Sequence, residues 1–139
     1  MATAQAQAPY NMPVLIVEDE KHLVELYEAH ISRWPFSVTV YVAPNGYEAL
    51  ILAGEVQPKL LICDLRLPGV NGFNIVRGLC QVERFKDMRI VVVSGLPLAE
   101  IQAHGGLPER VTVMSKPVAY DQLQIIAEGL WKTAAGAAT

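Results

Sequence analysis

The stretch LLICDLRLPGVNG, residues Leu60 to Gly72, begins with an apolar run and passes through Asp64 into a segment rich in proline and glycine. Four successive apolar residues are typical of a strand that is buried on both faces of a parallel sheet. An unpaired buried carboxylate is costly, so Asp64 lies either at the hydrated end of the strand or beside a partner group. The stretch therefore predicts a buried strand that ends in a candidate functional carboxylate.

Strands and helices alternate along the rest of the chain. Apolar runs predict four further strands, at 14–17, 37–42, 89–93 and 111–114. Helical spacing and capping residues predict five helices, at about 21–34, 45–54, 73–85, 97–105 and 120–131. This alternation predicts an α/β fold of the flavodoxin-like, doubly wound kind, with a five-stranded parallel sheet in the order 2-1-3-4-5 and five helices.

The length and the hydrophobic content of the chain are typical of one domain. The chain has 139 residues, of which 52% are hydrophobic. We assign residues 13–132 to the domain and expect flexible tails at 1–12 and 133–139, because both ends are alanine-rich and lack periodicity.

Composition also narrows the location and the partners. No segment has the pattern of a signal peptide or of a membrane span, so a cytoplasmic protein without a membrane partner is expected. A net charge of −3 and a pI near 5.6 give no basic surface for nucleic acid, which we do not expect as a partner. The two cysteines, Cys63 and Cys80, lack CxxC spacing and are expected to be buried free thiols. The histidines lack metal-ligand spacing and are expected to be structural or solvated: His22, His30 and His104.

Polar residues follow four of the five predicted strands, the first, third, fourth and fifth, at the point where each ends: Glu18, Asp19, Asp64, Ser94 and Lys116. The carboxyl ends of parallel strands meet at the edge where such sheets bind ligands. Three carboxylates in one place repel one another, and a hard divalent cation with oxygen ligands relieves that repulsion. Together with a hydroxyl and a lysine, this set suits transfer of a phosphoryl group onto Asp64.

Each of these residues also has an ordinary explanation when taken alone. Acidic residues are favoured in the first turn of a helix, and Asp64 with the following Pro-Gly could simply form a turn. Ser94 could cap a helix and Lys116 could be a solvated surface cation. Their joint placement at one edge of the sheet favours a functional site over these separate explanations.

Four motifs in this order, VLIVEDE, LLICDLRLPGVNG, VVVSG and SKP, resemble the receiver domain of two-component response regulators. The resemblance extends from about Pro13 to about Trp131, and the intervals between the motifs are typical of that family. It implies that Asp64 accepts a phosphoryl group from a histidine kinase or a phosphotransfer protein. It also implies that Ser94 binds a phosphoryl oxygen and that Lys116 pairs with Asp64 or its phosphate.

The resemblance further implies a bound Mg²⁺ ion. Asp19 and Asp64 would hold it directly and Glu18 through water, with the backbone carbonyl of Arg66 as a further ligand. It also implies a cis peptide bond before Pro117, which is admissible because X-Pro bonds prefer trans only weakly.

One departure from the family pattern concerns the response to phosphate. Many receivers have an aromatic residue three positions before the lysine of the fifth strand, where this chain has Val113. The familiar switch, in which that ring turns inward, therefore cannot operate in its usual form. Apolar residues near this position make a homodimer a candidate partner: Leu96, Leu98, Ile101, Val111 and Val113.

The resulting expectation is a stand-alone receiver that signals by protein contact or phosphorelay, because no output domain follows Trp131. It would catalyse only its own phosphorylation and dephosphorylation, and so would not be a conventional enzyme. The alternative is a receiver-like module that binds proteins independently of phosphorylation. A phosphatase resembling the haloacid dehalogenase family is disfavoured, because Arg66 stands where those enzymes need a second acid.

Overall fold

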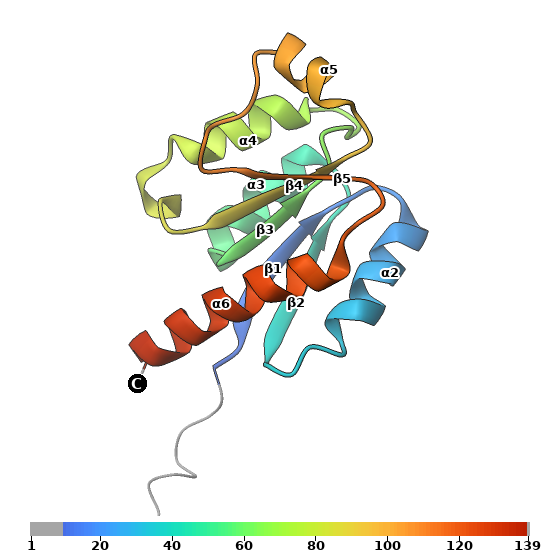
Figure 1. The fold of residues 1–139 in the computed structure, drawn as a ribbon. Helices are drawn as coiled ribbons and strands as arrows, with labels where there is room; N and C mark the ends of the chain where they lie inside the picture. The colour runs from blue at the N-terminus through green and yellow to red at the C-terminus, as the bar shows by residue number, and fades with distance from the viewer. Residues whose placement is uncertain (1–9, 139) are drawn as a thin grey trace, which may run out of the picture.

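The sheet in the computed structural model has the expected order, β2-β1-β3-β4-β5, with every strand parallel to its neighbours (Figure 1). The structure describes residues 10–138. The strands are β1 (Met12–Val17), β2 (Val38–Ala43), β3 (Leu60–Cys63), β4 (Arg89–Ser94) and β5 (Thr112–Ser115). The predicted topology is therefore confirmed, and each predicted strand is displaced by at most two residues at either end.

Helices cover both faces of the sheet (Figure 1). They are α2 (Lys21–Ile31), α3 (Gly46–Val56), α4 (Gly72–Cys80), α5 (Leu98–Ala103) and α6 (Tyr120–Ala138), with a short 3₁₀ turn, η1 (Glu83–Phe85). One core cluster combines one sheet face with α3, α4 and α5. The other combines the opposite face with α2 and α6. This two-sided coverage is what the doubly wound fold requires.

The alternation of side chains along β3 explains why its sequence is apolar throughout. Leu61 and Cys63 belong to the core on the α3 and α4 side, whereas Leu60 and Ile62 belong to the core on the α2 and α6 side. All four are almost completely inaccessible to solvent. Because β3 is buried on both faces, its first polar residue, Asp64, comes only where the strand reaches the edge of the sheet.

Two of the expected helix ends were wrong. The helix expected at 73–85 ends at Cys80, and Val82 is extended before η1 begins, which lets Phe85 reach the core with only 4% exposure. The final helix does not end at 131 but continues to Ala138, so residues 133–138 of the expected tail are helical. Alanine has the highest helix propensity and extends a helix without needing an apolar stripe.

The N-terminal boundary also differs from the expected one. Met12 lies in β1 and is completely buried, and the indole nitrogen of Trp131 donates to the Tyr10 carbonyl over 3.0 Å. The domain therefore includes residues of the expected tail from Tyr10 onward. The remainder of that tail, residues 1–9, lies outside the described residues. Within 10–138, no helix is both long and apolar enough to cross a membrane.

Both cysteines are free, as expected, but only one is fully buried. The Cys63 thiol donates to the Asp64 carbonyl over 3.2 Å, and burial raises its pKa to about 12. Cys80 is half-buried, and burial raises its pKa as well. Neither thiol is a ready nucleophile at neutral pH, since the thiolate is the reactive form.

Candidate functional site

Asp64 lies at the carboxyl end of β3, where the chain leaves the sheet. Its backbone amide donates to the Val17 carbonyl over 3.2 Å, which fixes it beside the end of β1. Asp64 is 7% exposed, and each oxygen of its carboxylate has a partner. Oδ2 accepts from Lys116 Nζ over 2.8 Å, and Oδ1 accepts from the Arg66 amide over 3.0 Å. Asp64 therefore has both a position at the sheet edge and a cationic partner.

Glu18 is the most deeply buried carboxylate near this edge, with 2% exposure. Its Oε2 accepts from the Glu20 amide over 3.2 Å, and its Oε1 lies 4.0 Å from Lys116 Nζ. Burial raises the pKa of Glu18, and the charge of Asp64 adds to the increase. The Glu20 amide and the Lys116 ammonium oppose it. Lys116 thus forms ion pairs with two carboxylates, and the contact with Asp64 is the shorter one.

Lys116 reaches the two carboxylates from the loop after β5. Burial alone would lower the pKa of Lys116, but the hydrogen bond and the charge of Asp64, together with Glu18, hold it above the ordinary value. The backbone amide of Lys116 donates to the Ser94 carbonyl over 2.9 Å, and the Lys116–Pro117 peptide bond is cis, as the resemblance implied. The lysine is therefore a fixed positive charge at the site.

Ser94 ends β4 and is 1% exposed. Its hydroxyl oxygen accepts from the Leu96 amide over 2.9 Å, closing a turn at the start of the β4–α5 loop. The N-cap of α5 is Pro97, so Ser94 does not cap this helix. Because the hydroxyl oxygen acts as an acceptor here, its hydrogen is left to donate to another group.

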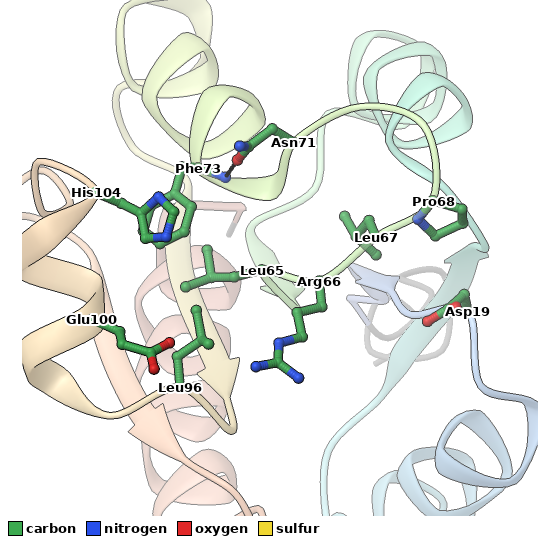
Figure 2. A pocket seen from close by; sticks show the side chains of 10 residues that line it. All are labelled: Asp19, Leu65, Arg66, Leu67, Pro68, Asn71, Phe73, Leu96, Glu100 and His104. Atoms are coloured by element: carbon green, nitrogen blue, oxygen red, sulfur yellow. Dashed lines mark hydrogen bonds between the residues drawn. The ribbon is translucent and has the colours of Figure 1, made fainter.

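An open cleft of about 690 Å³ extends from the end of β1 to the end of α5 (Figure 2). Asp19, which is exposed, lies at one end of the cleft and His104 at the other. The Arg66 side chain projects between them. The other lining residues are Leu65, Leu67, Pro68, Asn71, Phe73, Leu96 and Glu100. The cleft therefore gives a ligand access to the residues around the acceptor edge.

The donor atoms at this edge are oxygens, which are the ligands that Mg²⁺ prefers. No three His, Cys, Asp or Glu side chains in the described part of the chain are grouped closely enough to hold a metal ion. Mg²⁺ usually keeps several waters and binds through one or two carboxylates, so Asp19, Asp64 and the Arg66 carbonyl fit its chemistry. Glu18 is instead engaged by Lys116 and by the Glu20 amide. The metal ligands stay predictions.

The sequence did not single out the residues at the α5 end of the cleft. The His104 ring stacks on Phe73, with centroids 4.8 Å apart and planes 21° apart. Arg77, one turn beyond Phe73 on α4, donates to backbone carbonyls after α5. The i, i+4 spacing of Phe73 and Arg77 places them on the same face of a helix. No sequence signal, however, pairs that face with His104.

The apolar patch expected near α5 is only partly exposed. Ile101 is 3% exposed and belongs to the core, and Leu96 and Val111 pack against the same core cluster. Leu98 and Val113 are 66% and 40% exposed. Two of the five residues are therefore clearly available for a contact, and a homodimer stays a prediction.

The sequence is similar to that of a known regulatory protein and matches one family model. The transcriptional regulatory protein HptR of Staphylococcus aureus (strain NCTC 8325 / PS 47) is 29% identical over 121 residues, which cover 86% of this chain and 46% of HptR. The chain thus spans about half the length of the curated relatives that it matches first. The family model for the response regulator receiver domain matches residues 14–128.

Solved structures share the fold. The chemotaxis response regulator CheY4 of Vibrio cholerae has a TM-score of 0.68 at 20% identity, covering 87% of this chain and 99% of that one. The receiver domain of the sensor histidine kinase PA1611 from Pseudomonas aeruginosa PAO1, solved with a magnesium ion coordinated in its active site cleft, has a TM-score of 0.73 at 20% identity, with 88% and 99% covered. With the family model matching residues 14–128, the chain belongs to the response regulator receiver domain family of two-component signalling.

Proposed function

We propose that this receiver accepts a phosphoryl group on Asp64 from the phosphohistidine of a histidine kinase or phosphotransfer protein. It then signals by protein contact or passes the phosphoryl group on. The observation that carries the proposal is the 2.8 Å ion pair between Lys116 and Asp64 at the carboxyl edge of the sheet. A carboxylate with a fixed cation at its side, next to an open cleft, suits a phosphoryl acceptor.

The transfer is a displacement at phosphorus. A carboxylate oxygen of Asp64 attacks the phosphorus atom, and the bond from phosphorus to the imidazole nitrogen of the donor breaks. The electron pair of that bond stays on the imidazole, which is released, and Asp64 becomes a mixed carboxylic–phosphoric anhydride. Lys116 offsets the negative charge that gathers around the acceptor, so the protein contributes chiefly position and electrostatics.

A bound Mg²⁺ ion would neutralise part of the charge on the phosphoryl oxygens. Asp19, Asp64 and the Arg66 carbonyl are the proposed direct ligands, with Glu18 acting through water. Two observations support this assignment: the oxygen-rich donor set, and the magnesium ion in the cleft of the PA1611 receiver. Ser94 would donate its hydroxyl hydrogen to a phosphoryl oxygen.

The protein that donates the phosphoryl group needs a contact surface next to the acceptor. An apolar groove of about 430 Å³ lies between α2, the loop after β5 and the first residue of α6. It is lined by Leu23, Leu26, Tyr27, Pro117, Val118 and Tyr120. Lys116 also lines this groove, which makes the groove continuous with the Asp64 site. Apolar side chains of the phosphodonor protein are its proposed occupant.

Uptake of phosphate from a small acyl phosphate tests the proposal without a cognate kinase. One phosphate per chain is expected by intact mass when Mg²⁺ is present, and none on Asp64→Asn. The exposed Val113, in place of an aromatic residue, keeps a phosphorylation-independent binding module as the second candidate. Absence of uptake by the folded protein would favour that candidate.

A further inference from the structure

We propose that Arg77, Phe73 and His104 form a clasp that holds the end of α5 against α4 and opposes movement of the β4–α5 loop toward a phosphoryl group on Asp64. The inference rests on the proposed function and concerns what restrains this loop in this chain. Two members of the clasp, Phe73 and His104, line the α5 end of the cleft that begins at Asp19 (Figure 2).

The guanidinium of Arg77 makes the polar part of the clasp. Its Nη2 donates to the Gly106 carbonyl over 2.7 Å and also to the His104 carbonyl, while Nε donates to Gly106 over 3.3 Å. A planar fork with several donors suits two neighbouring carbonyls, which an ammonium group could not hold in the same way. The chain after α5 is therefore fixed to the last turn of α4.

Aromatic stacking makes the apolar part. Phe73 is 4% exposed, and the exposed His104 ring stacks on it at 4.8 Å. The Arg77 guanidinium lies 5.3 Å from the same Phe73 ring. One α4 phenyl ring thus contacts the α4 cation and the α5 imidazole, so the two parts of the clasp support each other.

Two glycines allow the backbone to meet Arg77. Gly105 and Gly106 have φ angles of +94° and +72°, in the left-handed region where other residues are strained. A Cβ atom on Gly105 would lie 3.2 Å from Arg77 Nη2. The Gly-Gly pair therefore ends the helix and lets the guanidinium approach the chain closely.

The hydrogen bond at the start of the loop links the clasp to the acceptor. Ser94 Oγ accepts from the Leu96 amide over 2.9 Å, so a displacement of this hydroxyl toward a phosphoryl group on Asp64 would draw Leu96 with it. α5 follows directly, and Ile101 is its one buried residue. Leu96 and Leu107, on either side of α5, also pack against the core cluster that contains Ile101. The clasp adds polar and stacking contacts to this packing at the end of α5.

The test uses the full chain with Mg²⁺ and beryllium fluoride as a phosphoryl mimic. Wild type is compared with Arg77→Gln and His104→Ala by hydrogen exchange over residues 96–107 and by titration of the mimic. Arg84→Gln is the matched control, because Arg84 lies 5.1 Å from the Phe85 ring on η1 and touches no part of the clasp. His104→Ala removes only an exposed ring, so it tests the clasp even where Arg77→Gln unfolds.

In the wild type, the mimic is expected to speed exchange over residues 96–107. Both clasp variants should show this faster exchange without the mimic and bind the mimic about three- to tenfold more tightly, since less work opposes the movement. Arg84→Gln should match the wild type. Faster exchange with unchanged mimic affinity would make the clasp purely structural and overturn the inference.

A second pair of outcomes separates this inference from the proposed function. A wild type that binds the mimic without any change in exchange over residues 96–107 would overturn the inference alone. A folded wild type that binds no mimic would overturn the proposed function and the inference with it.

Discussion

Lys116 Nζ lies 2.8 Å from Asp64 Oδ2, although the two residues are 52 positions apart and belong to strand ends that are not neighbours in the sheet. β4 lies between β3 and β5, so the lysine reaches over the end of β4, where Ser94 is. Asp64, Lys116 and Ser94, at the end of β4, therefore lie together at one edge of the sheet. This arrangement is the geometric basis of the proposed phosphoryl transfer.

Replacement of Lys116 by methionine keeps much of the side-chain length and removes the charge. We expect the rate of phosphorylation by an acyl phosphate to fall at least about tenfold, because a fixed cation near the acceptor is lost. Lys132→Met is the control, since Lys132 pairs with Glu128 on the exposed side of α6. A Lys116→Met rate equal to that of the control would contradict a role for Lys116 in the transfer.

Glu18 should make stability depend on pH. Burial raises its pKa in the folded protein above the ordinary value of 4.5, so between these two values the folded chain binds more protons than the unfolded chain. The free energy of unfolding contributed by Glu18 therefore falls as pH rises through this window.

Glu18→Gln should remove this dependence and raise the free energy of unfolding at neutral pH. Urea denaturation across the acidic to neutral range in EDTA measures it, with exposed Glu25→Gln as the control. Equal pH dependence in the wild type and Glu18→Gln would show that burial of Glu18 does not set it.

A glycine is required at position 72 because the start of α4 lies very close to the backbone of Leu65, the residue after Asp64. A Cβ atom there would lie 2.6 Å from the Leu65 carbonyl oxygen and 2.7 Å from the Leu65 Cα. We expect Gly72→Ala to lower the free energy of unfolding by about 1–3 kcal/mol. Gly78→Ala on the same helix meets nothing within 4 Å and should instead stabilise the fold, by about 0.5–1 kcal/mol. Equal effects in chemical denaturation would contradict the clash with Leu65.

The groove beside Lys116 should matter for phosphoryl transfer from a protein donor but not for uptake from a small donor. Leu26, which lines the groove, is 46% exposed, and Leu50 on α3 is 43% exposed outside it. We expect Leu26→Asp to slow transfer from a phosphorylated histidine protein about tenfold or more, because a charge replaces an apolar contact. Uptake from acetyl phosphate should not change. Leu50→Asp should leave both reactions unchanged, and equal loss in the two variants would move the contact away from the groove.

The sheet could be predicted because local patterns and general topology rules agree. Short apolar runs alternate with helical segments, and right-handed crossovers leave few strand orders. Asn45 shows the same agreement at a helix start: its side chain accepts from the Glu48 amide over 2.9 Å and donates to the Glu48 carboxylate over 3.0 Å. The polar residues at strand ends converge for the same reason, since the register fixes where each strand stops.

Contacts between distant side chains could not be predicted in the same way. The Phe73–His104 stack and the Arg77 hydrogen bonds depend on how the α5 end is placed in space, which no periodicity encodes. Lys116 contacts both Asp64 and Glu18, and which of the two contacts is shorter likewise depends on side-chain conformations. The length of α6 was missed because alanine-rich sequence carries high helix propensity without an apolar pattern.

The most direct test of the central claim is to find which residue carries the phosphate. The protein is treated with acetyl phosphate and Mg²⁺ and then with borohydride, which reduces an aspartyl phosphate to homoserine, and the peptides are examined by mass spectrometry. Conversion of Asp64 alone, and none in Asp64→Asn or without Mg²⁺, is the result that our account predicts. Conversion of a different residue, or none at all in the folded wild type, would contradict it.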